Sequence, residues 1–405
     1  MKQLFYTLSL VFLLGSLAAQ PVTKVLFIGI DGVRSDALRQ ANTPNMDSLI
    51  AGGTFTFSSW HLRTTMSGPS WSAMLTGVWE EKHGVTSNNY SNPNWTEYPY
   101  FVTRAKEFRP DIKAVQITSW DPMSSQVTND GWDQKVVLGE DNDCVAAGVS
   151  LLANDTALDV LFVHIDDVDA TGHANGFNPQ YATYINAIEY ADVQVGQLMT
   201  ALKSRPNFNN ESWVVMLTTD HGGLGNGHGG VTREEREIWW IGWSNLGALP
   251  KQELIVDLGS LDPLDYIFPN ANDFDEAPLL VDICVTAIDH LLPNVDPDTV
   301  TRWDLDGKSW LNKTTGINNI TVNVTGGNIF PNPTNGTFTL SMQHVKHDIS
   351  YRLFDLDGRA ITSGLVPFTA DKVDVQLDLR KEPAGVYLLE VTHNGISMVN
   401  RIVKN

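Results

Sequence analysis

The chain has 405 residues, of which 42% are hydrophobic, so it can build a large buried core and is too long for one domain of average size. It carries 27 lysine and arginine residues against 47 aspartate and glutamate residues, a formal net charge of −20. Such an acidic surface repels nucleic acid and excludes DNA or RNA binding as the main role, although it also simply keeps an exported protein soluble.

The first 19 residues have the pattern of a secretory signal peptide. Lys2 supplies a positive charge, residues 4–14 are almost wholly apolar, and small residues follow at Ser16, Ala18 and Ala19. The apolar run is too short to span a bilayer, and no later stretch predicts a transmembrane segment. We therefore expect cleavage close to Ala18 and export of the remaining chain.

From Lys24 to about Trp310 the chain alternates apolar runs with helical patterns. Continuous apolar runs, which are typical of strands buried on both faces, occupy residues 24–30, 158–165, 213–219 and 238–243. Helix candidates between them include residues 179–203 and 277–292. This alternation predicts an α/β fold, a three-layer sandwich around a mostly parallel central sheet.

Acidic residues follow three of the predicted strands. Asp31 follows the first, Asp166 follows the second, and Asp220 follows the third. Ligands of such sheets bind at the carboxyl ends of the strands, so these side chains are expected at one edge. A single aspartate at a strand end more often caps a helix. The interpretation as a ligand-binding site therefore depends on all three acids occurring together.

A hydroxyl-rich segment contains the candidate nucleophile. Ser67 precedes a predicted helix that begins near Pro69 or Ser70. Unpaired N–H donors and the positive end of the helix dipole favour an alkoxide and an anionic substrate at this position. The alternative is that these hydroxyls only cap the helix.

Two further segments combine carboxylates with histidines. Asp169 and His173 are four residues apart, so one helical turn or a tight loop aims both at one ion. The pair Asp220–His221 is followed by a glycine-rich loop that contains His228. Two carboxylate-and-imidazole sets beside a hydroxyl match a two-metal phosphoryl-transfer site, and the mixed ligands indicate two Zn²⁺ ions, with Mn²⁺ or another divalent ion left open.

These segments, in this order, resemble the alkaline phosphatase superfamily, especially its type I phosphodiesterase and nucleotide pyrophosphatase branch, over residues 24–310. The resemblance implies two ion sites, one formed by Asp31, Asp220 and His221, and the other by Asp169, His173 and a third histidine. In that branch the third histidine lies much later in the chain. Here residues 229–289 contain no histidine, and His228 is the expected substitute.

The same resemblance places Ser67 as the nucleophile and Asn88 as an amide that holds a phosphoryl oxygen. Met66 and Gly68 replace the lysine and phenylalanine that flank the nucleophile in the branch, which argues against nucleotide preference. Trp71 stands where a sulfatase motif has its arginine. The implied function is hydrolysis of a small-molecule phosphate ester through a phosphoserine. A sulfatase and a non-catalytic surface protein that binds metal or phosphate are the alternatives.

The composition changes near residue 312. Residues 312–328 are rich in Asn, Thr and Gly and predict a linker, and residues 329–405 show the short alternating runs of a small all-β sandwich. The predicted division is therefore a signal peptide over 1–19, a catalytic domain over 20–311, this linker and this sandwich.

Three stretches of the C-terminal part resemble the sorting domain of the type IX secretion system: Phe330-Pro-Asn-Pro-Thr-Asn-Gly336, Asp357-Gly358-Arg359 and Gly385-Val-Tyr-Leu. The resemblance implies the type IX secretion machinery as a partner, and a location outside the cell or on its outer surface. An adhesive or carbohydrate-binding β module is the alternative.

Two questions stay open in the sequence. Cys144 and Cys284 are either a disulfide or two buried free thiols. Residues 86–142 are rich in aromatic side chains that either form the rim of the substrate pocket or pack in the core, namely Trp95, Tyr98, Trp120 and Trp132.

Overall fold

The computed structural model describes residues 21–127, 131–254, 262–274, 277–311, 328–343, 348–355, 359–368, 372–393 and 396–405. The predicted signal peptide, the predicted linker up to residue 327, and residues 357–358 of the sorting-domain resemblance lie outside these ranges. The chain divides into two compact units, residues 1–313 and 314–405, each described by itself.

The N-terminal unit is built on one eight-stranded sheet in the order β4-β3-β5-β1-β6-β7-β2-β8. Its strands are β1 (Val22–Ile30), β2 (Thr54–Trp60), β3 (Lys113–Thr118), β4 (Gln134–Val137), β5 (Leu158–Ile165), β6 (Glu211–Thr218), β7 (Glu237–Ser244) and β8 (Gln252–Glu253). Only β7 runs against its neighbours, β6 and β2. The prediction of a mostly parallel sheet is confirmed.

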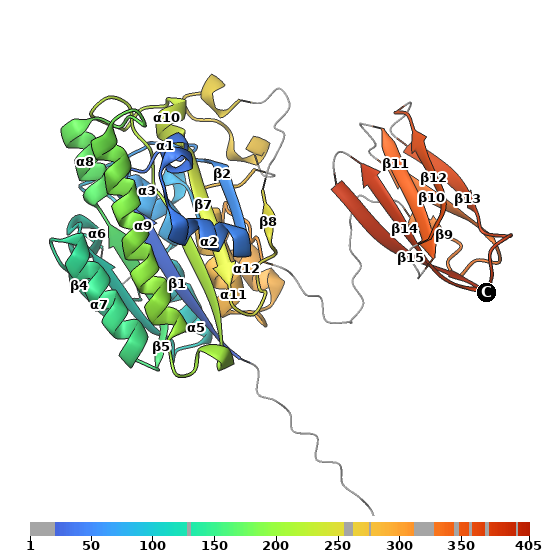
Figure 1. Ribbon diagram of the computed structural model, residues 1–405, viewed down its shortest axis with the longest axis horizontal. Helices are drawn as coiled ribbons and strands as arrows, with labels where there is room; N and C mark the ends of the chain where they lie inside the picture. The colour runs from blue at the N-terminus through green and yellow to red at the C-terminus, as the bar shows by residue number, and fades with distance from the viewer. Residues whose placement is uncertain are drawn as a thin grey trace, which may run out of the picture. The chain divides into compact units, whose positions relative to one another are not determined.

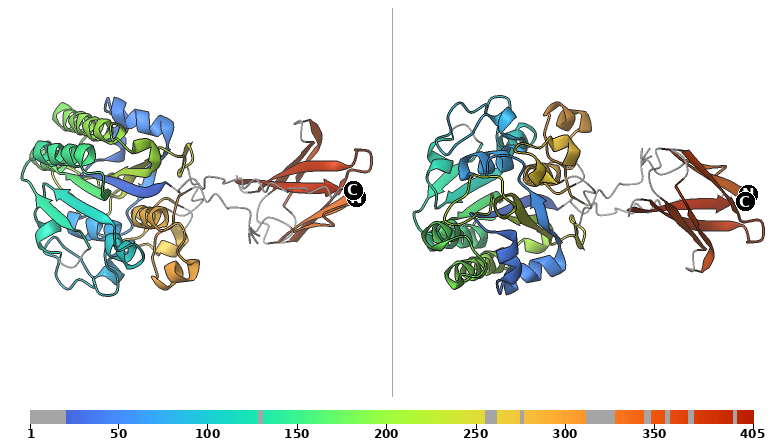
Figure 2. Two further views of the ribbon diagram at one scale, coloured as in Figure 1. Left: turned by 90° about the horizontal axis from the view of Figure 1, so that it is seen from below. Right: turned by 90° about the horizontal axis from the view of Figure 1, so that it is seen from above.

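Helices cover both faces of this sheet (Figures 1 and 2). One face packs against α1 (Ser35–Gln40), α2 (Pro44–Gly52), α7 (Asp141–Asn154), α8 (Asp167–Asn175) and α9 (Ala182–Lys203). The opposite face packs against α3 (Ser67–Thr76), α5 (Phe101–Phe108) and α11 (Asp282–Leu291). Short helices complete the unit: α4 (Glu80–His83), α6 (Pro122–Ser125), η1 (Phe208–Asn210), α10 (Arg233–Arg236), η2 (Pro263–Asp265), η3 (Ala271–Phe274) and α12 (Pro297–Arg302).

The apolar strands and helices predicted from the sequence are present, with shifted ends. The predicted helix over 179–203 begins at Ala182, and the one over 277–292 begins at Asp282. The helix predicted to begin near Pro69 or Ser70, α3, begins at Ser67, two or three residues earlier. The three-layer α/β prediction is confirmed, since a separate apolar core lies on each face of the sheet.

The central strands bring the polar strand ends together. β1 pairs in parallel with β5 on one side and with β6 on the other. Asp31 directly follows β1, Asp166 follows β5, and Asp220 lies two residues after β6. Three segments that are far apart in the sequence therefore meet at one edge of the sheet.

The C-terminal unit is entirely antiparallel. A three-stranded sheet, β13-β10-β9, and a four-stranded sheet, β12-β11-β14-β15, share one apolar core. The strands are β9 (Asn328–Phe330), β10 (Thr337–Gln343), β11 (Ile349–Asp355), β12 (Ala360–Val366), β13 (Lys372–Asp378), β14 (Gly385–His393) and β15 (Ile396–Lys404). The predicted small β sandwich is confirmed.

The two open questions also receive answers. Cys144 and Cys284 are buried free thiols in the cores on opposite faces of the sheet. The four aromatic side chains belong to the core around α5 more than to an open rim: Tyr98 is buried, and Trp95, Trp120 and Trp132 pack against that core. Within the described ranges, no helix has the length and apolar character needed to cross a membrane.

Candidate metal centre

Three ligand side chains gather where β1 and β6 end, and we call them the buried half-site: Asp31, Asp220 and His221. His221 Nε2 lies 3.5 Å from Asp31 Oδ1 and 3.2 Å from Asp220 Oδ2. All three side chains are at most 1% exposed. Adjacent parallel strands deliver all three, because the backbones of β1 and β6 are paired along their whole length.

A second group, the exposed half-site, consists of Asp169, His173 and His228. Asp169 and His173 are one turn apart on α8, as predicted, with 3.3 Å between Oδ2 and Nε2. His228 comes from the glycine-rich loop, and its Nε2 lies 3.1 Å from His173 Nε2 and 3.7 Å from Asp169 Oδ1. The histidine that the sequence left least certain therefore lies beside the other two ligands.

The two half-sites are in direct contact. The rings of His221 and His228 stack with their centroids 3.7 Å apart. Ligand atoms of Asp169, His221 and His228 also lie within 4.8 Å of one another, so His221 borders both groups. The structure thus brings all six sequence-predicted ligands into one cluster.

Each histidine of the cluster has one ring nitrogen bound to the backbone. The Nδ1 atoms of His173, His221 and His228 lie 2.8–2.9 Å from the carbonyl oxygens of Asn226, Gly222 and Thr65. A carbonyl oxygen only accepts, so Nδ1 carries the proton in each ring. Each Nε2 then offers its lone pair to the cluster, which is the usual arrangement of a metal-binding imidazole.

The carboxylates also direct free atoms into the cluster. Asp31 Oδ1, Asp169 Oδ1 and Asp220 Oδ2 are buried and have no hydrogen-bond partner among the described residues. Burial, with the nearby charges of Asp31 and Asp166, raises the pKa of Asp169 to about 9. Burial, with Asp31 and Asp169, also raises the pKa of Asp220 well above its ordinary value. Unpaired carboxylate oxygens that repel one another in a dry space suit bound cations.

The candidate nucleophile lies beside the buried half-site. Ser67 is the first residue of α3, is 6% exposed, and places its Oγ 3.5 Å from His221 Nε2. Asn88 approaches the same helix end, where its Oδ1 accepts a hydrogen bond of 2.7 Å from the Gly68 N–H. Because the oxygen accepts that bond, the atom of the Asn88 amide that can donate to a substrate oxygen is its NH₂ nitrogen.

Two site residues were not identified from the sequence. His164, the penultimate residue of β5, places Nε2 3.2 Å from Asp31 Oδ2, and Trp71 of α3 donates its Nε1–H to the same oxygen at 3.0 Å. The sequence could have identified His164, because a histidine inside an otherwise apolar strand suggests a specific polar role. Nothing in the sequence indicated a hydrogen bond from Trp71, because a tryptophan in a buried helix usually only packs in the core.

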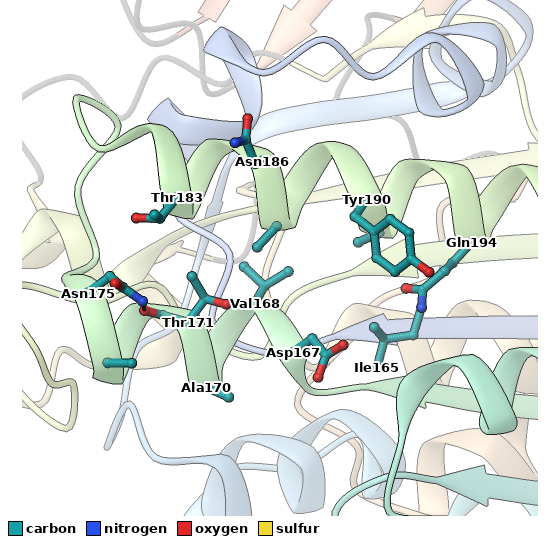
Figure 3. A pocket seen from close by; sticks show the side chains of 13 residues that line it. Ile165, Asp167, Val168, Ala170, Thr171, Asn175, Thr183, Asn186, Tyr190 and Gln194 are labelled. Carbon is teal, nitrogen blue, oxygen red and sulfur yellow. Dashed lines mark hydrogen bonds between the residues drawn. The ribbon is translucent and has the colours of Figure 1, made fainter.

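A pocket of about 440 Å³ between α8 and α9 lies away from this chemistry. Figure 3 shows Asp167 and Thr171 of α8 in its lining, together with Tyr190 and Gln194 of α9. These α8 residues are about half a turn away from Asp169 and His173, so the pocket and the exposed half-site occupy opposite faces of the helix.

Comparisons with known proteins show which families this chain resembles. The family profile "Type I phosphodiesterase / nucleotide pyrophosphatase" matches residues 25–229, which is 205 of the 405 residues. A profile for a secretion system C-terminal sorting domain matches residues 328–405.

Among curated relatives, an uncharacterized pyrophosphatase/phosphodiesterase of Schizosaccharomyces pombe is 25% identical over 56% of this chain and 49% of its own length. Human bis(5'-adenosyl)-triphosphatase ENPP4 is 25% identical over 49% of this chain and 47% of its own length. The chain spans about half the length of these relatives. A solved 2-O GAG sulfatase shares the fold, with a TM-score of 0.53, 14% identity and coverage of 72% of this chain and 73% of that one.

Proposed function

Because the chain belongs to the type I phosphodiesterase/nucleotide pyrophosphatase family, we propose that it is an exported, metal-dependent phosphoric ester hydrolase that acts through a covalent phosphoserine. The observation that carries the proposal is the convergence of three imidazole Nε2 atoms and three unpaired carboxylate oxygens beside Ser67. Nitrogen and oxygen donors in this mixture suit two Zn²⁺ ions, and Mn²⁺ is the next candidate.

The proposed roles follow from position. Two divalent cations, when bound, supply the positive charge that ionises a hydroxyl and offsets charge on phosphoryl oxygens. Ser67 Oγ forms the new bond to phosphorus as the ester oxygen leaves, and water then breaks the Ser67–phosphorus bond and restores the serine. The NH₂ of Asn88 donates to a phosphoryl oxygen at the N-terminus of α3.

The substrate is proposed to be a small phosphate ester other than a nucleotide. The human relative is named for a bis(5'-adenosyl) compound, but Gly68 of this chain occupies the position where the branch carries phenylalanine. A Cβ atom at Gly68 would lie 2.8 Å from the Ser87 carbonyl oxygen and 2.9 Å from Asn88 Cα. A phenylalanine there requires the Asn88 loop to move, so we propose that the aromatic base platform is absent.

The proposed route of export has two signals. Residues 1–19 act as a signal peptide, residues 20–311 form the catalytic domain, and residues 312–328 link it to the sorting domain at 329–405. The match of residues 328–405 to a secretion system sorting domain supports recognition of this part by the type IX machinery. The protein is then released from the cell or retained on its outer surface.

Two alternatives have distinct signatures. A sulfatase has the same fold, but Trp71 stands in place of the motif arginine and donates its N–H to Asp31. A surface protein that only binds metal or phosphate needs no nucleophile, yet Ser67 lies at a helix N-terminus beside the ligands. Both features favour the phosphoric ester hydrolase.

The deciding experiment is a substrate screen with purified, metal-loaded protein. We expect turnover of para-nitrophenyl phosphate or its diester, faster than turnover of an aryl sulfate, and loss of turnover in Ser67→Ala or after treatment with a chelator. Ser87→Ala is the matched control, because its hydroxyl lies on a neighbouring loop and donates to Asn89. Preferential cleavage of the aryl sulfate, or stoichiometric metal without any turnover, contradicts the proposal.

A further inference from the structure

Asp31 differs from the other cluster carboxylates because one of its oxygens is fully occupied by side-chain donors. Asp31 Oδ2 lies 3.0 Å from Trp71 Nε1 and 3.2 Å from His164 Nε2. An ionised carboxylate only accepts, so both nitrogens carry hydrogens that point at this oxygen. Oδ1, in contrast, has no hydrogen-bond partner among the described residues and faces His221.

The side chains of the two donors, Trp71 and His164, are held in place by packing and by a polar contact. The rings of Trp71 and His164 pack edge to face, with centroids 5.0 Å apart and planes at 83°. Trp71 lies directly over β1 at Gly29, where a Cβ atom would come within 2.3 Å of its ring. The far nitrogen of His164 faces the hydroxyl of Thr118 at 3.3 Å. Glycine on β1 and a hydroxyl on β3 thus fix both rings inside the protein.

We propose that His164, together with Trp71, is a positioning residue that restricts Asp31 to binding an ion through Oδ1 alone. The saturated Oδ2 cannot turn toward the ion without breaking two buried hydrogen bonds. Single-oxygen binding suits a small four-coordinate ion such as Zn²⁺, whereas larger ions such as Ca²⁺ prefer six to eight oxygens and often bidentate carboxylates. The pair therefore sets both affinity and ion preference at the buried half-site.

The alternative assignment is that His164 is itself a ligand. Its ring, Asp31 and Asp166 form a third group whose ligand atoms lie within 4.8 Å of one another. The geometry favours the positioning role, because the nitrogen nearest to Asp31 carries a hydrogen that is directed at Oδ2. A histidine ligand presents a lone pair instead.

This inference rests on the metal-dependent function proposed above, so its test measures ion binding separately from turnover. The full-length protein and its variants are loaded with Zn²⁺, and stoichiometry and affinity are measured by competition with a chromophoric chelator, then repeated with Ca²⁺ as competitor. His164→Phe removes the donor and keeps a ring, whereas His164→Gln keeps an N–H that can reach Asp31. Ser125→Ala is the control, because its hydroxyl donates to Asp121 and contacts neither His164 nor Trp71 among the described interactions.

We expect two ions per chain in every folded variant. His164→Phe and Trp71→Phe should each weaken the tighter Zn²⁺ site by about 10–100-fold and reduce the ratio of Zn²⁺ affinity to Ca²⁺ affinity. His164→Gln and Ser125→Ala should bind Zn²⁺ within about threefold of the parent. If His164→Phe does not fold, Trp71→Phe provides the test. If Trp71→Phe does not fold, His164→Phe provides it.

Three results overturn the inference. The first is an unchanged zinc affinity in both phenylalanine variants. The second is three ions in the parent and two in His164→Phe, which makes His164 a ligand. The third is a parent protein that binds no ion, which also removes the proposed function, whereas the first two leave that function intact.

Discussion

The two halves of the candidate metal centre offer the same kinds of ligand side chain from different structural elements. The buried half-site lies at the ends of paired central strands, and its side chains are at most 1% exposed. The exposed half-site is carried by α8 and a glycine-rich loop, and the side chain of His173 is 46% exposed. We infer that the buried half determines whether a metal centre exists, and that the exposed half determines how readily it exchanges its ion.

The strongest test of this difference is Asp220→Asn in the buried half-site. The amide keeps an oxygen to accept the Gly32 N–H at 3.2 Å, but it removes one anionic ligand. We expect kcat to fall by at least about 10³-fold, since removal of even a single neutral donor to transition-state charge costs about 10²–10³. Steady-state kinetics over a wide range of zinc concentration measures the effect.

The same variant should also change stability in opposite directions with and without metal. Without metal, the raised pKa of Asp220 means that burying this carboxyl costs stability at neutral pH, so an amide in its place should raise the melting temperature. With metal, the usual stabilisation by a bound ligand should be much reduced. A variant that melts lower than the parent in the presence of chelator contradicts our view that these carboxylates repel one another in the absence of cations.

His173→Ala tests the exposed half-site. The ring faces solvent and contributes one of three ligands, so water can replace it at the ion. We expect activity to fall by about 10–100-fold at limiting zinc and to recover substantially at high zinc, unlike Asp220→Asn. Titration of activity with zinc measures both properties, and a loss that no zinc concentration restores contradicts the assigned difference.

The sequence predicted the buried half more securely than the exposed half, for a physical reason. An apolar run followed by an acid locates a strand end, and parallel strands bring their carboxyl ends to one edge, which was sufficient to place Asp31 and Asp220 together. The position of His228 depends on the path of a glycine-rich loop, which no periodic pattern specifies. Its place beside His173 could be inferred only from the resemblance and from the absence of histidine over residues 229–289.

Contacts between distant side chains were the part that the sequence could not supply. His164 and Trp71 are 93 residues apart, yet both donate to the same oxygen of Asp31. That pairing depends on how α3 packs across β1 and β5, and packing of this kind follows from the complete fold. The structure likewise moved the start of α3 to Ser67, because the segment that precedes the proline already joins the helix.

A chelator should remove zinc from the two half-sites at different rates. The side chain of His173 in the exposed half-site is 46% exposed, whereas those of Asp220 and His221 in the buried half-site are fully buried, so an ion bound there would be less accessible to a chelator. We expect zinc to leave in two phases whose rate constants differ by at least about tenfold, which corresponds to about 1.4 kcal/mol in barrier height. Stopped-flow measurement with a chromophoric chelator detects the phases, and release of both ions in a single phase contradicts the comparison.

The smallest expected effect comes from a matched pair of supporting residues, Asn226→Ala and Thr219→Val. Asn226 is exposed and donates its amide to the His173 carbonyl oxygen, so water can replace that bond, and unfolding free energy should change by less than about 0.5 kcal/mol. Thr219 is fully buried, accepts from the Val33 N–H and donates to the His221 carbonyl oxygen, so valine leaves both groups unpaired and should cost about 1–3 kcal/mol. Denaturant unfolding of the two variants measures the difference, and equal losses would mean that the exposed half is held as firmly as the buried one.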